Sequence, residues 1–167
     1  MSDGLTTAAA DSAAVGVFKI ALGVEYKGSR YRGFQRQRAG VPSIQESLEK
    51  ALSKVAGGAA VTLSCAGRTD ALVHASAQVV HFATTVERSM HAWVMGANMN
   101  LPADISVTWA KSMPAHFDAR FCAQARRYRY VIYNDQIRPA HMAEEVTWNH
   151  RPLDVERMRQ AAKAFVG

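Results

Sequence analysis

The sequence has few cysteines, and neither of them belongs to a recognisable site. Cys65 and Cys122 are the two cysteines in 167 residues, and no CxxC pair or metal-ligand spacing surrounds them. The six histidines show no HExxH or similar pairing. We therefore expect reduced thiols of the cytoplasmic kind and no metal site.

The chain also lacks a long hydrophobic run, and acidic residues are outnumbered by basic ones. No apolar stretch is long enough to cross a bilayer, so we expect no membrane partner and a cytoplasmic location. Twenty Lys and Arg against fourteen Asp and Glu give a net charge of +6. An excess of positive charge favours a polyanionic partner, although a merely soluble basic protein would have the same composition.

The length and composition predict one ordinary domain that follows a short tail. Hydrophobic residues make up 49 % of the chain, which is enough for a full core. Residues 1–16 are rich in small and polar residues and contain no Lys or Arg, so we expect a flexible tail rather than a secretory signal. We divide the remainder into a domain at 17–134 and a connection with a terminal helix at 135–167.

Strand and helix patterns alternate along the domain. Runs of alternating apolar and polar residues predict strands at 18–26, 61–65, 78–82 and 105–109. Ser43 and Ser89 each precede apolar residues at helical spacing and are suited to cap a helix. The order β-α-β-β-α-β predicts an α+β domain of ferredoxin-like fold with an antiparallel sheet. Beyond it, we expect a strand at 126–133 and a helix starting near Asp154.

Asp70 lies in the connection between the second and third predicted strands. Connections on a rigid scaffold are where binding and catalytic groups tend to lie, although an isolated Asp in a turn more often bonds its own backbone. Here Arg68 is two residues away and can hold the carboxylate ionised by its opposite charge. An ionised carboxylate can act as a nucleophile.

Two stretches combine arginines with aromatic residues. The first, at 27–38, has no helical or strand period, and the second is the predicted strand at 126–133. Arginine pairs with phosphate and aromatic rings stack on bases, so both stretches favour RNA contact; an exposed basic loop and a surface strand would look similar. The candidate RNA-binding residues are Arg30, Arg32, Arg36, Arg126, Arg127 and Arg129.

Several motifs in order resemble the TruA family of tRNA pseudouridine synthases. The family hallmark Gly-Arg-Thr-Asp-Ala-Gly-Val-His stands here as Gly67-Arg68-Thr69-Asp70-Ala71-Leu72-Val73-His74. The supporting stretches are Tyr26-Lys27-Gly28 through Gln37, Ser43-Ile44-Gln45-Glu46, Asn100-Leu101-Pro102, Phe117-Asp118-Ala119-Arg120-Phe121 and Ala125-Arg126-Arg127-Tyr128-Arg129-Tyr130. The resemblance covers nearly everything after the tail.

This resemblance implies an isomerisation of uridine to pseudouridine in the anticodon stem-loop of tRNA, without a cofactor, by a homodimer. The catalytic aspartate maps onto Asp70, the hallmark arginine onto Arg68 and the active-site tyrosine onto Tyr128, and His74 joins the RNA-binding residues. The target base must leave the stack. Arg68 would pair with Asp70, fill the vacated stack, or both, while Tyr128 would stack on the uracil or accept a proton. Attack at the sugar C1′ and attack at the uracil C6 both stay open.

Two departures from the family pattern affect these expectations. Leu72 replaces a glycine, the residue used where φ is positive or another chain approaches closely. The family also continues into a second half, so we expect this chain to be a truncated N-terminal part with impaired activity. The alternative is a non-catalytic RNA-binding or dimerisation module, although the Lys/Arg-Gly-Phe/Tyr run of a generic RNA-recognition domain is missing.

Overall fold

The computed structural model describes residues 16–166 and divides the chain into two compact units, one ending at Ala123 and one beginning at Gln124. The tail expected at 1–16 lies almost entirely outside the described residues. The units divide earlier along the chain than the boundary expected at residue 135, and the sequence-based domain division stays a prediction. Each unit is described by itself below.

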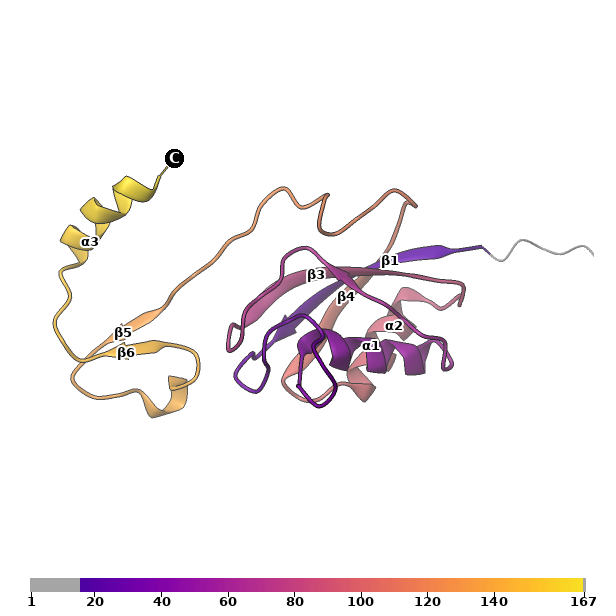
Figure 1. Ribbon diagram of the computed structural model, residues 1–167, viewed down its shortest axis with the longest axis horizontal. Helices are drawn as coiled ribbons and strands as arrows, with labels where there is room; N and C mark the ends of the chain where they lie inside the picture. The colour runs from indigo at the N-terminus through magenta and orange to yellow at the C-terminus, as the bar shows by residue number, and fades with distance from the viewer. Residues whose placement is uncertain (1–15, 167) are drawn as a thin grey trace, which may run out of the picture. The chain divides into compact units, whose positions relative to one another are not determined.

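The first unit is a four-stranded antiparallel sheet with two helices on one face (Figure 1). The strand order is β2-β3-β1-β4, which with the two helices confirms the predicted ferredoxin-like α+β fold. The elements in chain order are β1 (Phe18–Tyr26), α1 (Ile44–Val55), β2 (Ser64–Cys65), β3 (Ala75–Thr84), α2 (Met90–Asn100) and β4 (Ile105–Met113).

The core lies between the sheet and the two helices. Alternate residues of β1 face the helices, and Leu22 and Val24 are fully buried there. Trp93 of α2 is also fully buried, with its ring 5.0 Å from the ring of Phe82 on β3 in an edge-on arrangement. Each such side chain contributes about 1.5–3 kcal/mol through burial, so this contact fixes α2 against the sheet.

The helices begin where the sequence predicted. The Ser43 hydroxyl accepts a hydrogen bond from the Glu46 backbone N–H at 3.4 Å, and the Ser89 hydroxyl accepts one from the Ala92 N–H at 3.1 Å. Gly57 follows α1 with φ 69°, a left-handed conformation that stops the helix.

The predicted strand at 61–65 is shortened to its last two residues, because α1 supplies the missing hydrogen bonds. The Val61 N–H donates to the Ser53 hydroxyl at 3.0 Å, and the Leu63 N–H donates to a carboxylate oxygen of Glu49 at 3.1 Å. These backbone groups are satisfied by helix side chains, so they need no neighbouring strand. The segment before the Asp70 connection is therefore attached to α1 as well as to the sheet.

The second unit contains a short parallel pair of strands and one helix. Its elements are β5 (Ile132–Asn134), η1 (Ala140–Met142), β6 (Thr147–Asn149), α3 (Val155–Ala162) and η2 (Lys163–Phe165). The Asp154 carboxylate accepts a hydrogen bond from the Arg157 N–H at 3.0 Å, so the helix starts as predicted. The apolar residues of this last helical segment are exposed: Val155, Met158, Ala162, Phe165 and Val166.

The prediction of a strand at 126–133 is wrong for most of that range. Only Ile132 and Tyr133 of that range belong to β5, and residues 124–131 are exposed without regular structure. Alternation of side chains makes a strand possible, but a strand also needs a neighbour for its backbone hydrogen bonds. Among the described residues, β6 pairs only with Ile132–Asn134.

Candidate functional site

The Asp70 connection leaves the sheet between β2 and β3, and its first residues are anchored on β3. The Ala66 N–H donates to the Val79 carbonyl at 2.8 Å. The side-chain amide of Gln78 then bonds both backbone groups of Gly67, accepting at its Oε1 from the Gly67 N–H and donating from its Nε2 to the Gly67 carbonyl. Because Gln78 is buried, this bridge sets the direction in which the loop leaves the sheet.

The centre of the loop is held by the basic stretch at 27–38. The Phe34 N–H donates to the Thr69 carbonyl at 2.9 Å, and the Thr69 hydroxyl lies 2.8 Å from the hydroxyl of buried Tyr26. Gly33 has φ 99°, and a Cβ there would lie 2.9 Å from the Thr69 carbonyl oxygen. A glycine is therefore required at Gly33, and the structure brings the arginine-rich stretch against the residue that precedes Asp70.

The far end of the loop is held at Gly28. Its backbone N–H donates to Nδ1 of His74 at 3.2 Å, and a Cβ at Gly28 would lie 2.1 Å from the Val73 carbonyl oxygen. The half-buried His74, predicted as an RNA-binding residue, thus also has a positioning role that sequence reasoning did not identify. Nδ1 of His74 must carry a lone pair to accept this bond, so the proton of the neutral ring lies on Nε2.

Asp70 itself is exposed at the top of this clamped loop, together with Arg68. Within the described chain no ion pair joins the two side chains, so both are available to a ligand. The Asp70 carbonyl accepts a bond from the Val73 N–H at 3.3 Å, which closes a tight turn. Leu72 sits inside that turn with φ 68°, a left-handed conformation that is rare for a bulky residue.

A second arginine, Arg120, acts electrostatically on the same buried thiol as Arg68 does. Burial raises the pKa of the Cys65 thiol, and the positive charges of Arg68 and Arg120 partly oppose that shift. The thiol is therefore protonated near neutral pH and unsuited to act as a nucleophile. The two guanidinium groups add positive charge beside the loop that carries Asp70, which suits a phosphate-bearing ligand.

Arg120 reaches this position because the segment 117–121 is attached to the sheet. Buried His81 on β3 accepts a hydrogen bond at Nδ1 from the Ala119 N–H at 3.1 Å, and its ring meets the edge of Phe117. Lys19 of β1 donates to the Phe117 carbonyl at 2.9 Å. The segment 117–121 is recognisable as a motif in the sequence, but its attachment through His81 joins residues too far apart in sequence to be inferred.

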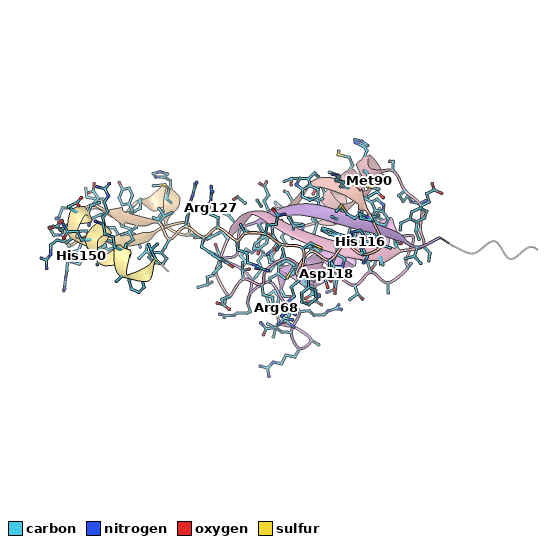
Figure 2. All side chains as sticks on the ribbon, turned by 90° about the horizontal axis from the view of Figure 1, so that it is seen from above. Arg68, Met90, His116, Asp118, Arg127 and His150 are labelled. Carbon is cyan, nitrogen blue, oxygen red and sulfur yellow. The ribbon has the colours of Figure 1, made fainter. Side chains whose placement is uncertain are left out.

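Asp118 shapes the turn that presents Arg120. One of its carboxylate oxygens accepts from the Arg120 N–H at 2.8 Å and from the Phe121 N–H at 3.2 Å, and the other lies 3.8 Å from Nε2 of His81. Both Arg68 and Asp118 belong to the first unit (Figure 2).

The three arginines predicted in the first basic stretch differ in how they are engaged. Arg30 lies 3.6 Å from a carboxylate oxygen of Asp104, and Arg36 lies 3.1 Å from one of the buried Glu49. Arg32 is exposed and forms no ion pair within residues 16–166. Its charge is therefore the least neutralised of the three.

Asp104 also anchors the basic stretch at 27–38 through two further hydrogen bonds. It accepts a hydrogen bond from the Tyr31 hydroxyl at 2.7 Å, and its carbonyl accepts one from the Lys27 N–H at 2.9 Å. Burial, together with the bond to Asp104, raises the pKa of the Tyr31 hydroxyl, which therefore stays protonated. The basic stretch is thus a built part of the first unit rather than a loose loop.

The other predicted site residues belong to the second unit. Arg126, Arg127, Tyr128 and Arg129 lie on the exposed segment that precedes β5, and the Tyr128 side chain is 70 % exposed. The first unit alone holds Asp70, its flanking arginine and His74. In the part of the chain that the structure describes, no three His, Cys, Asp or Glu side chains are placed to hold a metal ion, and no helix is long and apolar enough to span a membrane.

The fold and the loop together define an α+β protein that presents a clamped, exposed carboxylate beside arginines. This chain belongs to the tRNA pseudouridine synthase family, whose model matches residues 23–122. The resemblance inferred from the sequence is thereby confirmed.

Two relatives show the extent of the match. The chain is 73 % identical to tRNA pseudouridine synthase A of Pseudomonas aeruginosa over 167 residues, which is all of this chain and 58 % of that protein. It is 58 % identical to tRNA pseudouridine synthase A of Klebsiella pneumoniae over 151 residues, which is 90 % of this chain and 55 % of that protein. The chain therefore spans somewhat more than half the length of these relatives.

Proposed function

We propose that this chain isomerises uridine to pseudouridine in tRNA, with the Asp70 carboxylate as nucleophile. The observation that carries the proposal is the presentation of Asp70: an exposed carboxylate on a loop held from both sides by the basic stretch. The membership of the tRNA pseudouridine synthase family supports the reaction class. Preorganisation of this kind favours catalysis because little reorganisation is needed when the substrate binds.

The chemistry needs a nucleophile and a proton acceptor but no redox partner. The N1–C1′ glycosidic bond breaks, the uracil turns, a C5–C1′ bond forms, and the C5 proton is lost to a base. Attack of the Asp70 carboxylate on C1′ would displace the uracil, whereas attack on C6 would give a covalent adduct of the base. Neither route changes the oxidation level of the whole nucleoside, so no cofactor enters the proposal.

The target uridine must leave its base stack to reach Asp70. Arg68 is exposed two residues before Asp70, and it pairs with the carboxylate, fills the space that the base vacates, or does both. Tyr128 is proposed to stack on the uracil, with its phenol as a proton acceptor. The ring of an exposed tyrosine is suited to stacking on a base.

The arginines of both units are proposed to bind the phosphates of the anticodon stem-loop. Arg30, Arg32 and Arg36 act from the first unit, and Arg126, Arg127 and Arg129 from the second. His74 lies at the end of the Asp70 loop and would approach the same RNA. A second copy of the chain is the proposed protein partner, and sedimentation at several concentrations tests it by the mass of the species.

The decisive experiment measures tritium release from C5-labelled tRNA by the chain and by a chimera in which the remainder of the Pseudomonas aeruginosa relative follows Gly167. Asp70→Asn keeps the shape of the side chain and removes the nucleophile, so release should fall to background while tRNA binding persists. Glu87→Gln, which alters an exposed carboxylate beyond the other end of β3, is the matched control and should leave release unchanged.

Release by Asp70→Asn near the rate of the parent would refute the assignment of Asp70. Binding of tRNA without release by the parent, in both forms, would instead favour the alternative of a non-catalytic RNA-binding module.

A further inference from the structure

Leu72 combines two features that the fold alone does not explain. Its φ of 68° makes it the one non-glycine residue with a left-handed backbone among residues 16–166. Its side chain is 59 % exposed, so burial in the protein does not offset the unfavourable conformation.

Leu72 keeps this conformation because the residues on both sides of it in the loop are held by hydrogen bonds. Thr69 is bonded to Phe34 and Tyr26 on one side, and His74 is bonded to Gly28 on the other. With both ends held, the residues between them have little freedom to relax. Strain that persists in this way is a common feature of functional sites.

The position of Leu72 indicates what covers its side chain. Arg68 lies two residues before Asp70, and Leu72 lies two residues after it. Arg68 and Leu72 therefore flank the proposed nucleophile along the loop. Any substrate that brings a nucleotide to Asp70 must pass close to both. A base that has left the stack exposes the apolar faces of its neighbours, and apolar side chains are known to insert between base steps.

We propose that Leu72 is a wedge: its side chain packs against the face of the base next to the target uridine and holds the stack open while that uridine occupies the Asp70 site. This inference rests on the proposed function, because it needs an RNA substrate. Arg68 supplies charge on one side of Asp70, and Leu72 supplies apolar contact on the other. Leu72 thereby acts as a positioning residue for the substrate.

The first arm of the test separates strain from function by thermal unfolding. Leu72→Gly removes the strain and should raise the melting temperature by a few degrees. The matched control is Gly57→Leu at the end of α1, where φ is 69° and a Cβ would meet nothing within 4 Å. It places the same side chain in the same conformation away from the loop, so it should lower the melting temperature and leave RNA binding unchanged.

The second arm uses an anticodon stem-loop RNA with 2-aminopurine beside the target uridine, because the fluorescence of this base rises when it unstacks. The parent chain should bind the RNA and increase the fluorescence. Leu72→Gly should lose most of the increase and bind about tenfold more weakly, the loss expected when one apolar side chain no longer packs on a base. Leu72→Met should keep both, and so should Met99→Ala, which removes an exposed apolar side chain from α2.

Three outcomes decide the inference. Unstacking by Leu72→Gly equal to or greater than that of the parent would overturn it, since Leu72 would then merely crowd the RNA. Loss of the signal in Leu72→Gly together with full tritium release by Asp70→Asn would keep the wedge and refute the proposed nucleophile. A parent chain that neither binds nor unstacks the RNA would refute both proposals.

Discussion

The backbone N–H of Ala119 donates a hydrogen bond to Nδ1 of His81 at 3.1 Å, across 38 positions of the sequence. Both groups are buried, and the acceptor is a ring nitrogen that loses its lone pair when the imidazole is protonated. The segment that carries Arg120 is therefore attached to the sheet through a neutral histidine. Protonation would remove the attachment at its centre.

The first prediction concerns stability at acid pH. Burial lowers the pKa of His81, while Asp118 opposes the shift and Lys19 adds to it. The unfolded chain binds the proton more readily than the folded one, so the stability from neutral His81 is complete above the unfolded pKa of about 6.5 and is lost as the pH falls below it. Urea unfolding between pH 7 and pH 5 should show this decrease.

His81→Gln isolates this effect, because the glutamine amide can accept the hydrogen bond from Ala119 but does not titrate between pH 5 and pH 7. It should be less stable than the parent at pH 7 and show a smaller decrease in unfolding free energy on acidification. Parallel curves for the two proteins would mean that other groups cause the pH dependence.

The second prediction concerns Arg120. Arg120→Ala should weaken tRNA binding and reduce the slope of log affinity against log salt by about 0.7–0.9, the loss of one phosphate contact. Arg88→Ala is the matched control, since Arg88 is exposed beyond the other end of β3 and donates to the carbonyl of adjacent Glu87. Equal slopes for the parent and Arg120→Ala would place Arg120 outside the RNA contact.

The third prediction distinguishes arginines within the first basic stretch. Arg32→Ala should reduce the salt slope more than Arg36→Ala, because Arg36 already neutralises buried Glu49 whereas Arg32 is unpaired in the described chain. Arg36→Ala should instead lower stability, because it leaves the Glu49 carboxylate without its ionic partner. Binding titrations at several salt concentrations and urea unfolding measure the two effects; the reverse order of slopes would contradict this interpretation.

The fourth prediction concerns the clamp on the Asp70 loop. Gly28→Ala places a Cβ 2.1 Å from the Val73 carbonyl oxygen, so the loop must move and its bond to His74 weakens. We expect a loss of about 1–3 kcal/mol in unfolding free energy, together with loss of tritium release. Gly16→Ala, where a Cβ would meet nothing within 4 Å, is the control and should behave as the parent. Full activity in Gly28→Ala would show that the loop tolerates displacement.

The sequence predicted those features that depend on neighbouring residues. Ser43 and Ser89 mark helix starts because a cap acts within four residues, and the alternation in β1 follows from the pleat of a strand. The glycine pattern of the hallmark also pointed to an unusual backbone at Leu72, and its positive φ agrees. Local chemistry determines each of these features, so they can be read without knowing the rest of the fold.

The features that were missed depend on distant contacts. The role of His81 requires knowing that β3 lies beneath residues 117–121, and the position of Arg120 follows from it. The strand expected at 126–133 failed for the same reason, because alternation does not reveal whether a pairing partner is present. His74 was noted for RNA contact, whereas its bond to Gly28 became visible only once the two loops were placed together.

The central position of β1 has a consequence for how the protein is made. This strand leaves the ribosome before its two partners, β3 and β4, which end at Thr84 and Met113. At about 5–20 residues per second, its apolar residues wait on the order of several seconds for those partners to be synthesised. A sheet that depends on such distant pairings also folds more slowly than one built from adjacent hairpins. Among the strands of this sheet, nascent β1 is therefore the one that stays unpaired for the longest time after its synthesis.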